Sequence, residues 1–167
     1  MVWQTGPPSS WQCAEVSARR TKKRLVRFWD ASALVPLLIV ERGTPLAARW
    51  LRQDPAVVVW TLTRLELLSA LARQRRDDHR DVAALTAARR DLLHEWGRWS
   101  EITAIEVVRR HAERLVEAHP IKAADALQIG AALVAAQQTP ELYEFVTLDD
   151  VQATAAEREG LRVLTWP

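Results

Sequence analysis

Residues 25–34 read LVRFWDASAL, and this stretch decides the fold because an apolar run ends there in an acid and a helix begins. Leu25–Trp29 is long enough for a β-strand and too short for a helix. Asp30 follows, and the pattern from Ala31 to Glu41 predicts a helix that Gly43 ends. A strand followed directly by a helix is the first half of an alternating α/β pattern.

Short apolar segments of the same kind recur along the chain and alternate with helical patterns. Further strands are predicted at Ala56–Trp60, Tyr143–Thr147 and Leu161–Thr165. The predicted helices after the first are Leu46–Gln53, Thr63–Arg76, Asp81–Trp96, one within Ile102–His119, Ala123–Gln138 and Val151–Glu159. Alternating strands and helices favour a parallel sheet with helices on both faces, so the predicted fold class is α/β.

Four acidic residues stand where an apolar segment meets a turn or the start of a helix: Asp30, Glu66, Asp125 and Asp149. Asp30 and Asp149 follow predicted strands, at the edge where ligands gather in parallel sheets. Glu66 lies one turn into the helix after the second strand, and Asp125 opens a helix of small residues. Four carboxylates that converge at this edge would bind a divalent metal ion. Oxygen ligands without His or Cys select Mg²⁺ or Mn²⁺ rather than zinc.

Each acid taken singly also has a purely structural explanation. Asp30 and Asp149 have the position of caps for the helices that follow them. Asp125, in a first turn, suits the helix dipole. Thr63 and Glu66 have the spacing of a capping box, in which the Glu66 side chain satisfies a backbone N–H group.

Together the four acids are harder to explain in this way, because helix caps have no reason to gather at one edge of a sheet. Asp125 sits in an apolar pattern, where an unpaired charge is costly. Two carboxylates ~4 Å apart repel by ~4 kcal/mol at an effective dielectric of ~20, so a cluster needs protons or a cation. Either Asp149 or its neighbour Asp150 is the fourth acid. The hydroxyl groups of Ser32 and Thr147 are candidates to hold metal-bound water.

Four segments in order resemble the motifs of PIN-domain nucleases. The first is Phe28–Val35 (FWDASALV), in which a strand ends in Asp followed by Ser-Ala-Leu. The others are Leu62–Leu71 (LTRLELLSAL), Ala123–Ala132 (AADALQIGAA) and Phe145–Asp149 (FVTLD), and Gly160–Leu164 (GLRVL) resembles the closing strand. The order and spacing are similar over most of the chain, most closely to those of VapC-like toxins of toxin–antitoxin pairs.

The resemblance implies a PIN-like three-layer sandwich, with a central, mostly parallel sheet flanked by helices. It also implies a metal-dependent endoribonuclease, the toxin of a type II toxin–antitoxin pair, in which Asp30, Glu66, Asp125 and Asp149 are the catalytic and metal-binding acids. In the mechanism that we expect, Asp30 and Asp125 bind the metal ion directly, and Glu66 and Asp149 hold metal-bound water. The implied partners are an RNA substrate, a cognate antitoxin and a second copy in a homodimer.

Composition and charge are those of one ordinary domain preceded by a basic segment. The chain has 167 residues, of which 49% are hydrophobic, and a net charge of +2. Residues 1–24 carry a net +4 and are predicted to be a flexible extension, and residues 25–167, with a net −2, are predicted to be the nuclease domain. The lone Cys13 excludes a disulfide framework within the chain, which predicts a cytoplasmic protein. No apolar run is long enough to span a membrane, and the N-terminus lacks the pattern of a signal peptide.

Basic and aromatic side chains are weaker signals of RNA binding. The arginines that can flank the acids and hold phosphates are Arg64, Arg73, Arg75 and Arg76, although a solvated basic face explains the last two equally well. The tryptophans that can stack on bases are Trp50, Trp60, Trp96 and Trp99, and core packing is the commoner role for such residues.

Two rival functions remain compatible with parts of the sequence. One is phosphoryl transfer through an Asp nucleophile at Asp30, but Ser32 stands where enzymes of the haloacid-dehalogenase type have a second acid. The other is a non-catalytic PIN-like binding module. The chain departs from the pattern of many PIN-domain relatives at Gln128, where His is frequent, and at Asp150, where a basic residue is common.

Overall fold

A computed structural model of the protein describes residues 26–77, 81–137 and 143–167. The predicted N-terminal extension, residues 1–24, lies outside the described residues, as do Leu25 and Gln138. Within them, five strands form a single sheet in the order β3-β2-β1-β4-β5, and every neighbouring pair is parallel. The strands are β1 (Val26–Trp29), β2 (Val57–Trp60), β3 (Ser100–Ile102), β4 (Tyr143–Val146) and β5 (Arg162–Leu164).

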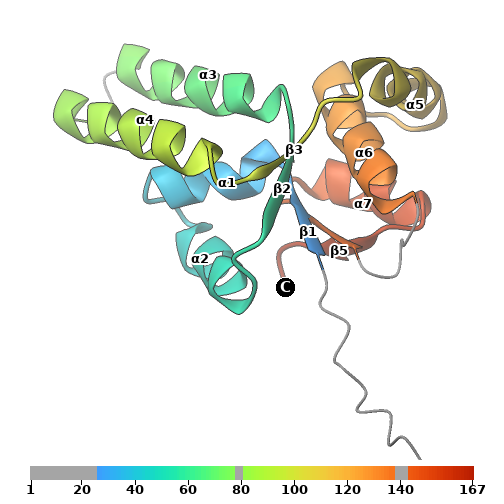
Figure 1. The fold of residues 1–167 in the computed structure, drawn as a ribbon, viewed down its shortest axis with the longest axis horizontal. Coiled ribbons are helices and arrows are strands. Elements are labelled where there is room, and N and C mark those ends of the chain that lie inside the picture. Colours follow the sequence, from blue (N-terminus) through green and yellow to red (C-terminus); the bar gives the residue numbers. More distant parts are fainter. Residues whose placement is uncertain (1–25, 78–80, 138–142) are drawn as a thin grey trace, which may run out of the picture.

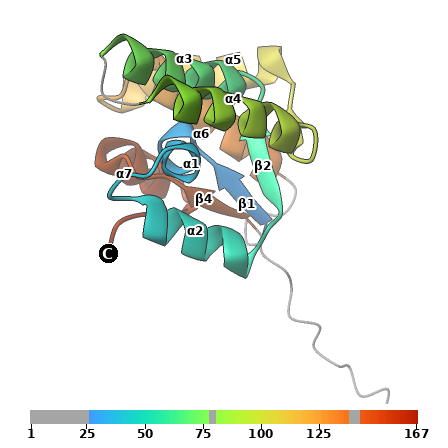
Figure 2. The same ribbon diagram turned by 90° about the vertical axis from the view of Figure 1, so that its left-hand side faces the viewer.

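Seven helices connect the described strands. They are α1 (Ala31–Leu38), α2 (Thr44–Gln53), α3 (Thr63–Arg76), α4 (Val82–Trp96), α5 (Ile105–Ala118), α6 (Ala123–Ala136) and α7 (Asp150–Arg158). Figure 1 shows α1 to α4 on one side of the sheet and α5 to α7 on the other, and Figure 2 shows the same arrangement from the side of α1 to α4. The predicted three-layer α/β sandwich is therefore confirmed.

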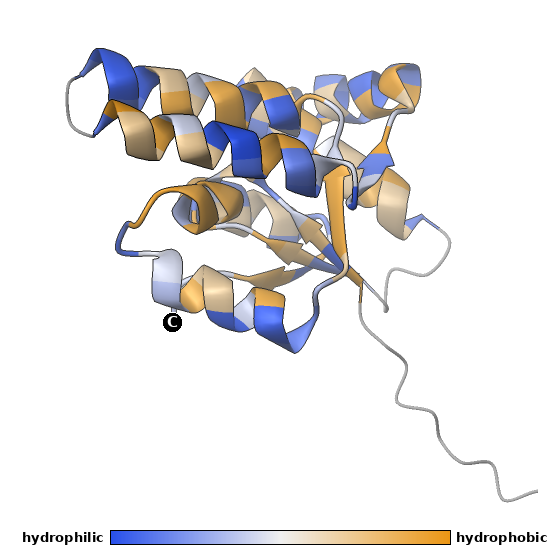
Figure 3. Cartoon of the chain, turned by 60° about the vertical axis from the view of Figure 1, so that its left-hand side comes forward, coloured by the Kyte–Doolittle hydropathy of each residue, from blue (hydrophilic) through white to orange (hydrophobic). Residues whose placement is uncertain are grey.

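The core consists of two layers because neighbouring residues of a strand point to opposite faces of the sheet. Phe28, Val58 and Phe145 pack beneath α5, α6 and α7. Trp29 and Val146, each one residue further along, pack beneath α1 to α4. The apolar strands lie between helices whose outward sides carry hydrophilic residues (Figure 3). Strands buried on both faces explain why β1, β2 and β4 read as continuous apolar runs.

The sequence-based prediction was wrong in two details. The first helix ends at Leu38 rather than Glu41, because the hydroxyl group of Thr44 accepts a hydrogen bond from the Glu41 N–H and donates one to the Pro36 carbonyl. These contacts turn the chain towards α2. The edge strand β3 was not predicted, since Ser100 and Glu101 are exposed and the segment lacks an apolar run.

The strand order places the carboxyl ends of β1, β2 and β4 at one edge of the sheet, in its three central positions. α1 and α3 start within a few residues of β1 and β2, and α7 starts shortly after β4. Side chains from these junctions can therefore meet although they are distant in the sequence. No helix in the described residues is long and apolar enough to cross a lipid bilayer.

Candidate functional site

Asp30 occupies the junction between β1 and α1, and its side chain is 5% exposed. One carboxylate oxygen, Oδ2, accepts hydrogen bonds from the Ser32 N–H at 2.9 Å and from the Thr147 hydroxyl group at 3.3 Å. The other oxygen, Oδ1, accepts one from the Gln152 side-chain amide at 3.2 Å. Burial raises the pKa of Asp30, because desolvation outweighs these neutral donors. Asp30 is thus both the predicted cap of α1 and a buried carboxylate held in one orientation.

A ring of hydroxyl and amide groups fixes that orientation. The single proton of the Thr147 hydroxyl group is shared between Asp30 and the nearer Gln152 Oε1, at 2.6 Å, and the Thr147 hydroxyl oxygen lies 3.1 Å from that of Ser32. The Ser32 hydroxyl oxygen in turn accepts a hydrogen bond from the Leu148 N–H. Ser32 and Thr147 therefore lie at the site, as predicted, but they hold Asp30 and the loop after β4. The role of Gln152 was missed, because its position in the sequence indicated only the first turn of α7.

Glu66 lies on the first turn of α3 and is half-buried. Its Oε2 atom accepts a hydrogen bond from the Gln128 side-chain amide, and Gln128 also donates to the Thr63 hydroxyl group at 2.9 Å. The predicted capping box is therefore wrong, since the cap of α3 has no side-chain hydrogen bond. Desolvation, with repulsion from the carboxylates of Asp30 and Asp125, raises the pKa of Glu66 to about 7.

Asp125 and Asp149 lie at the starts of α6 and α7. Asp125 Oδ2 accepts a hydrogen bond from the Lys122 N–H at 3.1 Å, and Asp149 Oδ1 accepts one from the Gln152 N–H at 2.9 Å. Asp149 is thus the predicted cap of α7. Burial and repulsion from Asp149 raise the pKa of Asp125, although Lys122 partly offsets this effect.

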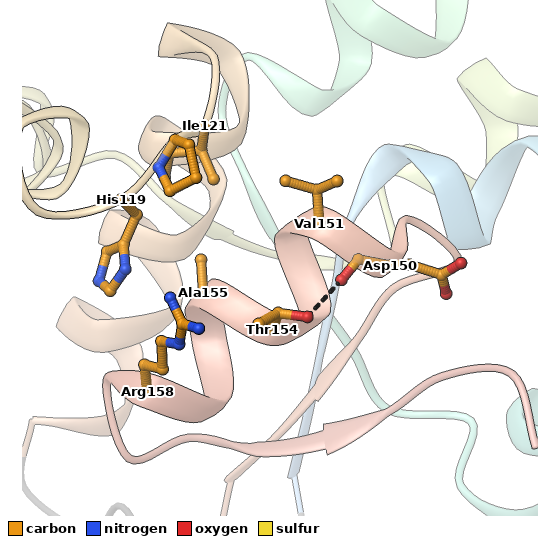
Figure 4. Close-up of a pocket in the computed structure, with 8 residues that line it drawn as sticks. His119, Ile121, Asp150, Val151, Thr154, Ala155 and Arg158 are labelled. Carbon is orange, nitrogen blue, oxygen red and sulfur yellow. Dashed lines mark hydrogen bonds between the residues drawn. The ribbon is translucent and has the colours of Figure 1, made fainter.

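Asp150 is exposed and lines a different cavity, of about 320 Å³, between α7 and the segment that joins α5 to α6. The side chain of Asp150 points away from His119 and Arg158, which line the same cavity (Figure 4). Asp149, rather than Asp150, interacts electrostatically with Asp125. This observation favours Asp149 as the fourth acid.

The four acids form a chain of mutually repelling charges at one edge of the sheet. Glu66 interacts with Asp30 and with Asp125, and Asp125 interacts with Asp149. Three of them, Glu66, Asp125 and Asp149, use one oxygen to hold local structure. Their second oxygens accept no hydrogen bond from the described part of the chain. Each is therefore available to a metal ion or to metal-bound water.

The donor chemistry fits Mg²⁺ or Mn²⁺, and the spacing of the donors limits how such an ion can be held. Among residues 26–77, 81–137 and 143–167, no three carboxylate, imidazole or thiol groups lie close enough together to enclose a metal ion. Mg²⁺ usually keeps several of its waters and binds directly to only one or two carboxylates. The arrangement therefore fits an ion that is held partly through water.

Some of the predicted basic and aromatic residues lie near the acids or at the surface, and others line a separate cavity or are buried in the core. Arg73 lines a groove that begins at Ser32, whereas Arg75 lines a separate cavity between α3 and α4. Arg64 lies over the ring of Trp96 at 6.0 Å and is exposed. Trp50 and Trp60 are buried in the two core layers and are unavailable for stacking on bases.

Comparisons with known proteins agree with this fold. The chain is 32% identical over 106 residues to Ribonuclease VapC45 of Mycobacterium tuberculosis, a match that covers 64% of this chain and 74% of the relative. No family model matches the chain. Among solved structures, PAE2754 from Pyrobaculum aerophilum superimposes with a TM-score of 0.57 at 19% identity, covering 86% of this chain and 88% of the other. VapBC2 from Rickettsia felis, solved bound to a DNA fragment from its promoter, gives a TM-score of 0.54 at 11% identity, with 86% and 100% covered.

The structural matches define the class of protein as one with the PIN-domain fold. Within that class, the identity to the curated relative is high enough, and covers enough of that relative, to assign a family. The chain belongs to the VapC-like family of PIN-domain proteins.

Proposed function

We propose that this protein is a metal-dependent endoribonuclease that acts as the toxin of a toxin–antitoxin pair. The observation that carries the proposal is the row of acids Asp30, Glu66, Asp125 and Asp149. Burial raises the pKa values of the first three, and repulsion from neighbouring acids adds to this effect for Glu66 and Asp125. A divalent cation would relieve that repulsion. The matched relative from Mycobacterium tuberculosis is a ribonuclease, which supports RNA as the substrate.

Asp30 and Asp125 would hold Mg²⁺ or Mn²⁺ directly, and Glu66 and Asp149 would hold water bound to it. The ion would supply charge stabilisation for the attacking and leaving oxygens of the phosphodiester bond. The hydroxyl and amide ring around Asp30 keeps its carboxylate fixed, which lowers the cost of ordering the site when substrate binds.

Glu66 is the best candidate for the general base that accepts a proton from the attacking water. Desolvation makes its carboxylate a stronger base than that of a fully solvated glutamate, and it lies beside Asp30 and Asp125, the proposed ligands of the ion that would bring the water. One of its oxygens is held by Gln128, which leaves the other free to face the water. Gln128 thus positions Glu66. Gln128 itself stands where many relatives have His.

The cognate antitoxin is proposed as the protein partner, and a homodimer as the assembly. The first is supported by the matched VapBC2 structure, which is bound to a DNA fragment from its promoter. Co-expression with the product of a neighbouring gene, followed by light scattering of the purified complex and of the protein alone, tests both. A monomer at all concentrations would reject the homodimer.

RNA cleavage by the purified protein tests the activity. We expect endonucleolytic cuts in a mixed RNA substrate with MnCl₂ or MgCl₂, and none with EDTA. The second candidate, a non-catalytic PIN-like binding module, is favoured by the absence of three closely spaced metal ligands in the described residues. RNA that is bound but stays intact with either metal at several concentrations would select that candidate.

A further inference from the structure

A second groove adjoins the acids on the side of Asp30. It has a volume of about 390 Å³, within the range of about 300–1,000 Å³ that is typical of pockets for small organic ligands. Its walls come from α1, the turn before α2, α3, the loop after β4 and the C-terminal segment. The groove begins at Ser32, whose hydroxyl oxygen lies 3.1 Å from that of Thr147, a hydrogen-bond donor to Asp30. The groove is therefore connected to Asp30 through the hydroxyl groups of Ser32 and Thr147.

Two exposed arginines give the groove a positive charge. Arg73 lies two turns beyond Glu66 on α3, and Arg42 precedes α2. Neither forms an ion pair with any of the described residues. One acid, Glu41, also lines the groove, so its lining has a net charge of +1. Unpaired guanidinium groups beside a row of carboxylates suit a phosphate next to the one being hydrolysed.

The groove also contains an aromatic platform at the end of the chain. The guanidinium group of Arg42 lies 5.3 Å from the centre of the Trp166 ring, and the Trp166 indole N–H donates to the Leu148 carbonyl at 3.0 Å. Leu148 directly precedes Asp149, so this hydrogen bond fixes the ring relative to the fourth acid. Aromatic rings and guanidinium planes are the surfaces on which unpaired RNA bases stack.

Gly43 allows the platform to form at this place. A methyl group on Gly43 would lie 2.5 Å from Leu148 Cδ1, 3.1 Å from Pro36 Cγ and 3.4 Å from the Trp166 ring. The turn before α2 therefore packs closely on Leu148 and Pro36, and a side chain at this position would require Leu148 to shift. The turn carries Arg42, which brings its guanidinium group over the indole ring.

We propose that this groove binds one nucleotide of single-stranded RNA beside the scissile phosphate, with the base stacked on the Arg42–Trp166 pair and a phosphate held by Arg73. The proposal rests on the proposed ribonuclease function for its substrate class. It assigns to Arg42, Arg73 and Trp166 a role in substrate binding and none in bond cleavage.

Two double variants with the same loss of charge test the groove. R42Q/R73Q removes both groove arginines, and R75Q/R89Q removes two arginines that line the cavity between α3 and α4. Both are made in a chain that also carries Asp30→Asn, so that binding is measured without cleavage. The probe is a fluorescein-labelled, 12-nucleotide single-stranded RNA of random sequence, followed by fluorescence anisotropy with 5 mM MgCl₂.

We expect R42Q/R73Q to raise the Kd by about tenfold and R75Q/R89Q to change it by less than about twofold. Arg73→Gln alone should reduce the slope of log K against log salt by about 0.7, the value for one lost phosphate contact on single-stranded RNA. Trp166→Phe keeps a stacking ring and should bind within about threefold of the parent. Trp166→Ala should lose about tenfold while its circular dichroism spectrum stays unchanged. Equal losses in the two double variants would overturn the proposal.

Three further outcomes complete the test, and the first two separate this proposal from the proposed function. For the first, both double variants are also made with Asp30 intact. If the wild-type chain cleaves the RNA with Mn²⁺ and these two variants cleave it at equal rates, the groove is not a substrate site, although the nuclease function stands. If no RNA is cleaved but R42Q/R73Q still binds about tenfold more weakly, the groove is an RNA site and the nuclease function fails. If R42Q/R73Q keeps its affinity for RNA but no longer co-purifies with the neighbouring-gene product, the groove binds a protein partner and the proposal is wrong.

Discussion

Two buried carboxylates, one within β4 and one directly after the neighbouring strand β1, have opposite surroundings. Glu144 in β4 lies beside Arg27 in β1, in register with it, and Arg27 Nε donates to its carboxylate at 3.1 Å. Asp30, three residues after Arg27, receives hydrogen bonds only from neutral hydroxyl, amide and backbone groups in the described part of the chain. Both acids are less than 10% exposed. Within the described residues, Glu144 therefore has a cation beside it, whereas Asp30 forms no ion pair.

The same contrast separates two half-buried glutamates. The guanidinium group of Arg114 and the ring of His119 hold Glu159 and lower its pKa to about 2. Glu66 has other carboxylates as its charged neighbours, and its pKa is raised to about 7. Glu144 and Glu159 are thus each paired with an arginine. Glu66, whose charged neighbours are Asp30 and Asp125, has a raised pKa and lies at the carboxyl edge of the sheet, and such perturbed acids are typical of functional sites.

The largest expected effect is on activity. Asp30→Asn or Asp125→Asn should lower the rate of RNA cleavage by about 10³-fold, because the charge that holds the metal ion is removed. Asn keeps the hydrogen-bond acceptor that caps α1. Thermal unfolding without metal should therefore be unchanged or shifted upwards. The matched control is Asp150→Asn, for which we expect less than a twofold loss; a loss as large as that of Asp30→Asn would contradict the choice of Asp149.

Glu144→Gln should have the opposite effect, lowering the stability of the fold and leaving the rate of RNA cleavage nearly unchanged. It leaves the buried Arg27 guanidinium group without its counter-charge, which costs about 3 kcal/mol of folding free energy in comparable buried pairs. Urea unfolding monitored by circular dichroism measures the loss. The rate of RNA cleavage at 10 °C, where the variant is still folded, should stay within about twofold of wild type. A stable but inactive variant would mean that the Arg27–Glu144 pair and the row of acids are not independent.

Metal binding should stabilise the protein only through the row of acids. At a metal concentration about 100 times the Kd, the gain is about 2.7 kcal/mol, which corresponds to a rise in Tm of about 5–10 °C for a chain of this size. Differential scanning fluorimetry with MnCl₂ measures it. Glu159→Gln should respond to Mn²⁺ as wild type does, whereas a variant carrying both Asp30→Asn and Asp125→Asn should not respond.

Much of the fold and the positions of the four acids could be predicted from the sequence. The contacts that could not be predicted have physical reasons. The strands ending at Trp29, Trp60 and Val146 are buried on both faces, so their apolar runs predicted a parallel sheet and placed Asp30 at its edge. The resemblance to the PIN-domain motifs identified the four acids as one set, and the VapC-like family is confirmed. Their role as metal ligands stays a prediction.

Other features depend on contacts between distant residues that carry no local pattern. The pairing of Arg27 with Glu144 joins positions 117 residues apart, and each residue lies within an apolar run that showed only a strand. Gln128 and Gln152 position Glu66 and Asp30 from helices far along the chain. An amide in a helix looks the same in the sequence whether it faces solvent or a carboxylate.

The smallest predicted effect concerns pH. The pKa of Glu66 is raised from 4.5 to about 7, so the folded state without metal binds its proton more tightly than the unfolded state does. The contribution of this proton to the folding stability is fully present below about pH 4.5 and is lost as the pH rises through 7. Wild type should therefore lose on the order of 2 kcal/mol relative to Glu66→Gln between pH 4.5 and pH 8, after allowance for partial exposure. Urea unfolding at several pH values measures the difference. A constant difference would mean that Glu66 is not destabilised by its neighbours.

The most direct test of the central claim is the location of Mn²⁺ in a crystal of the wild-type protein, found from its anomalous scattering. We expect a peak at the carboxyl edge of the sheet, about 2.1 Å from a carboxylate oxygen of Asp30 or Asp125, with waters bridging to Glu66 and Asp149. A well-ordered site with no Mn²⁺ at a saturating concentration, or Mn²⁺ bound only elsewhere on the surface, would contradict it.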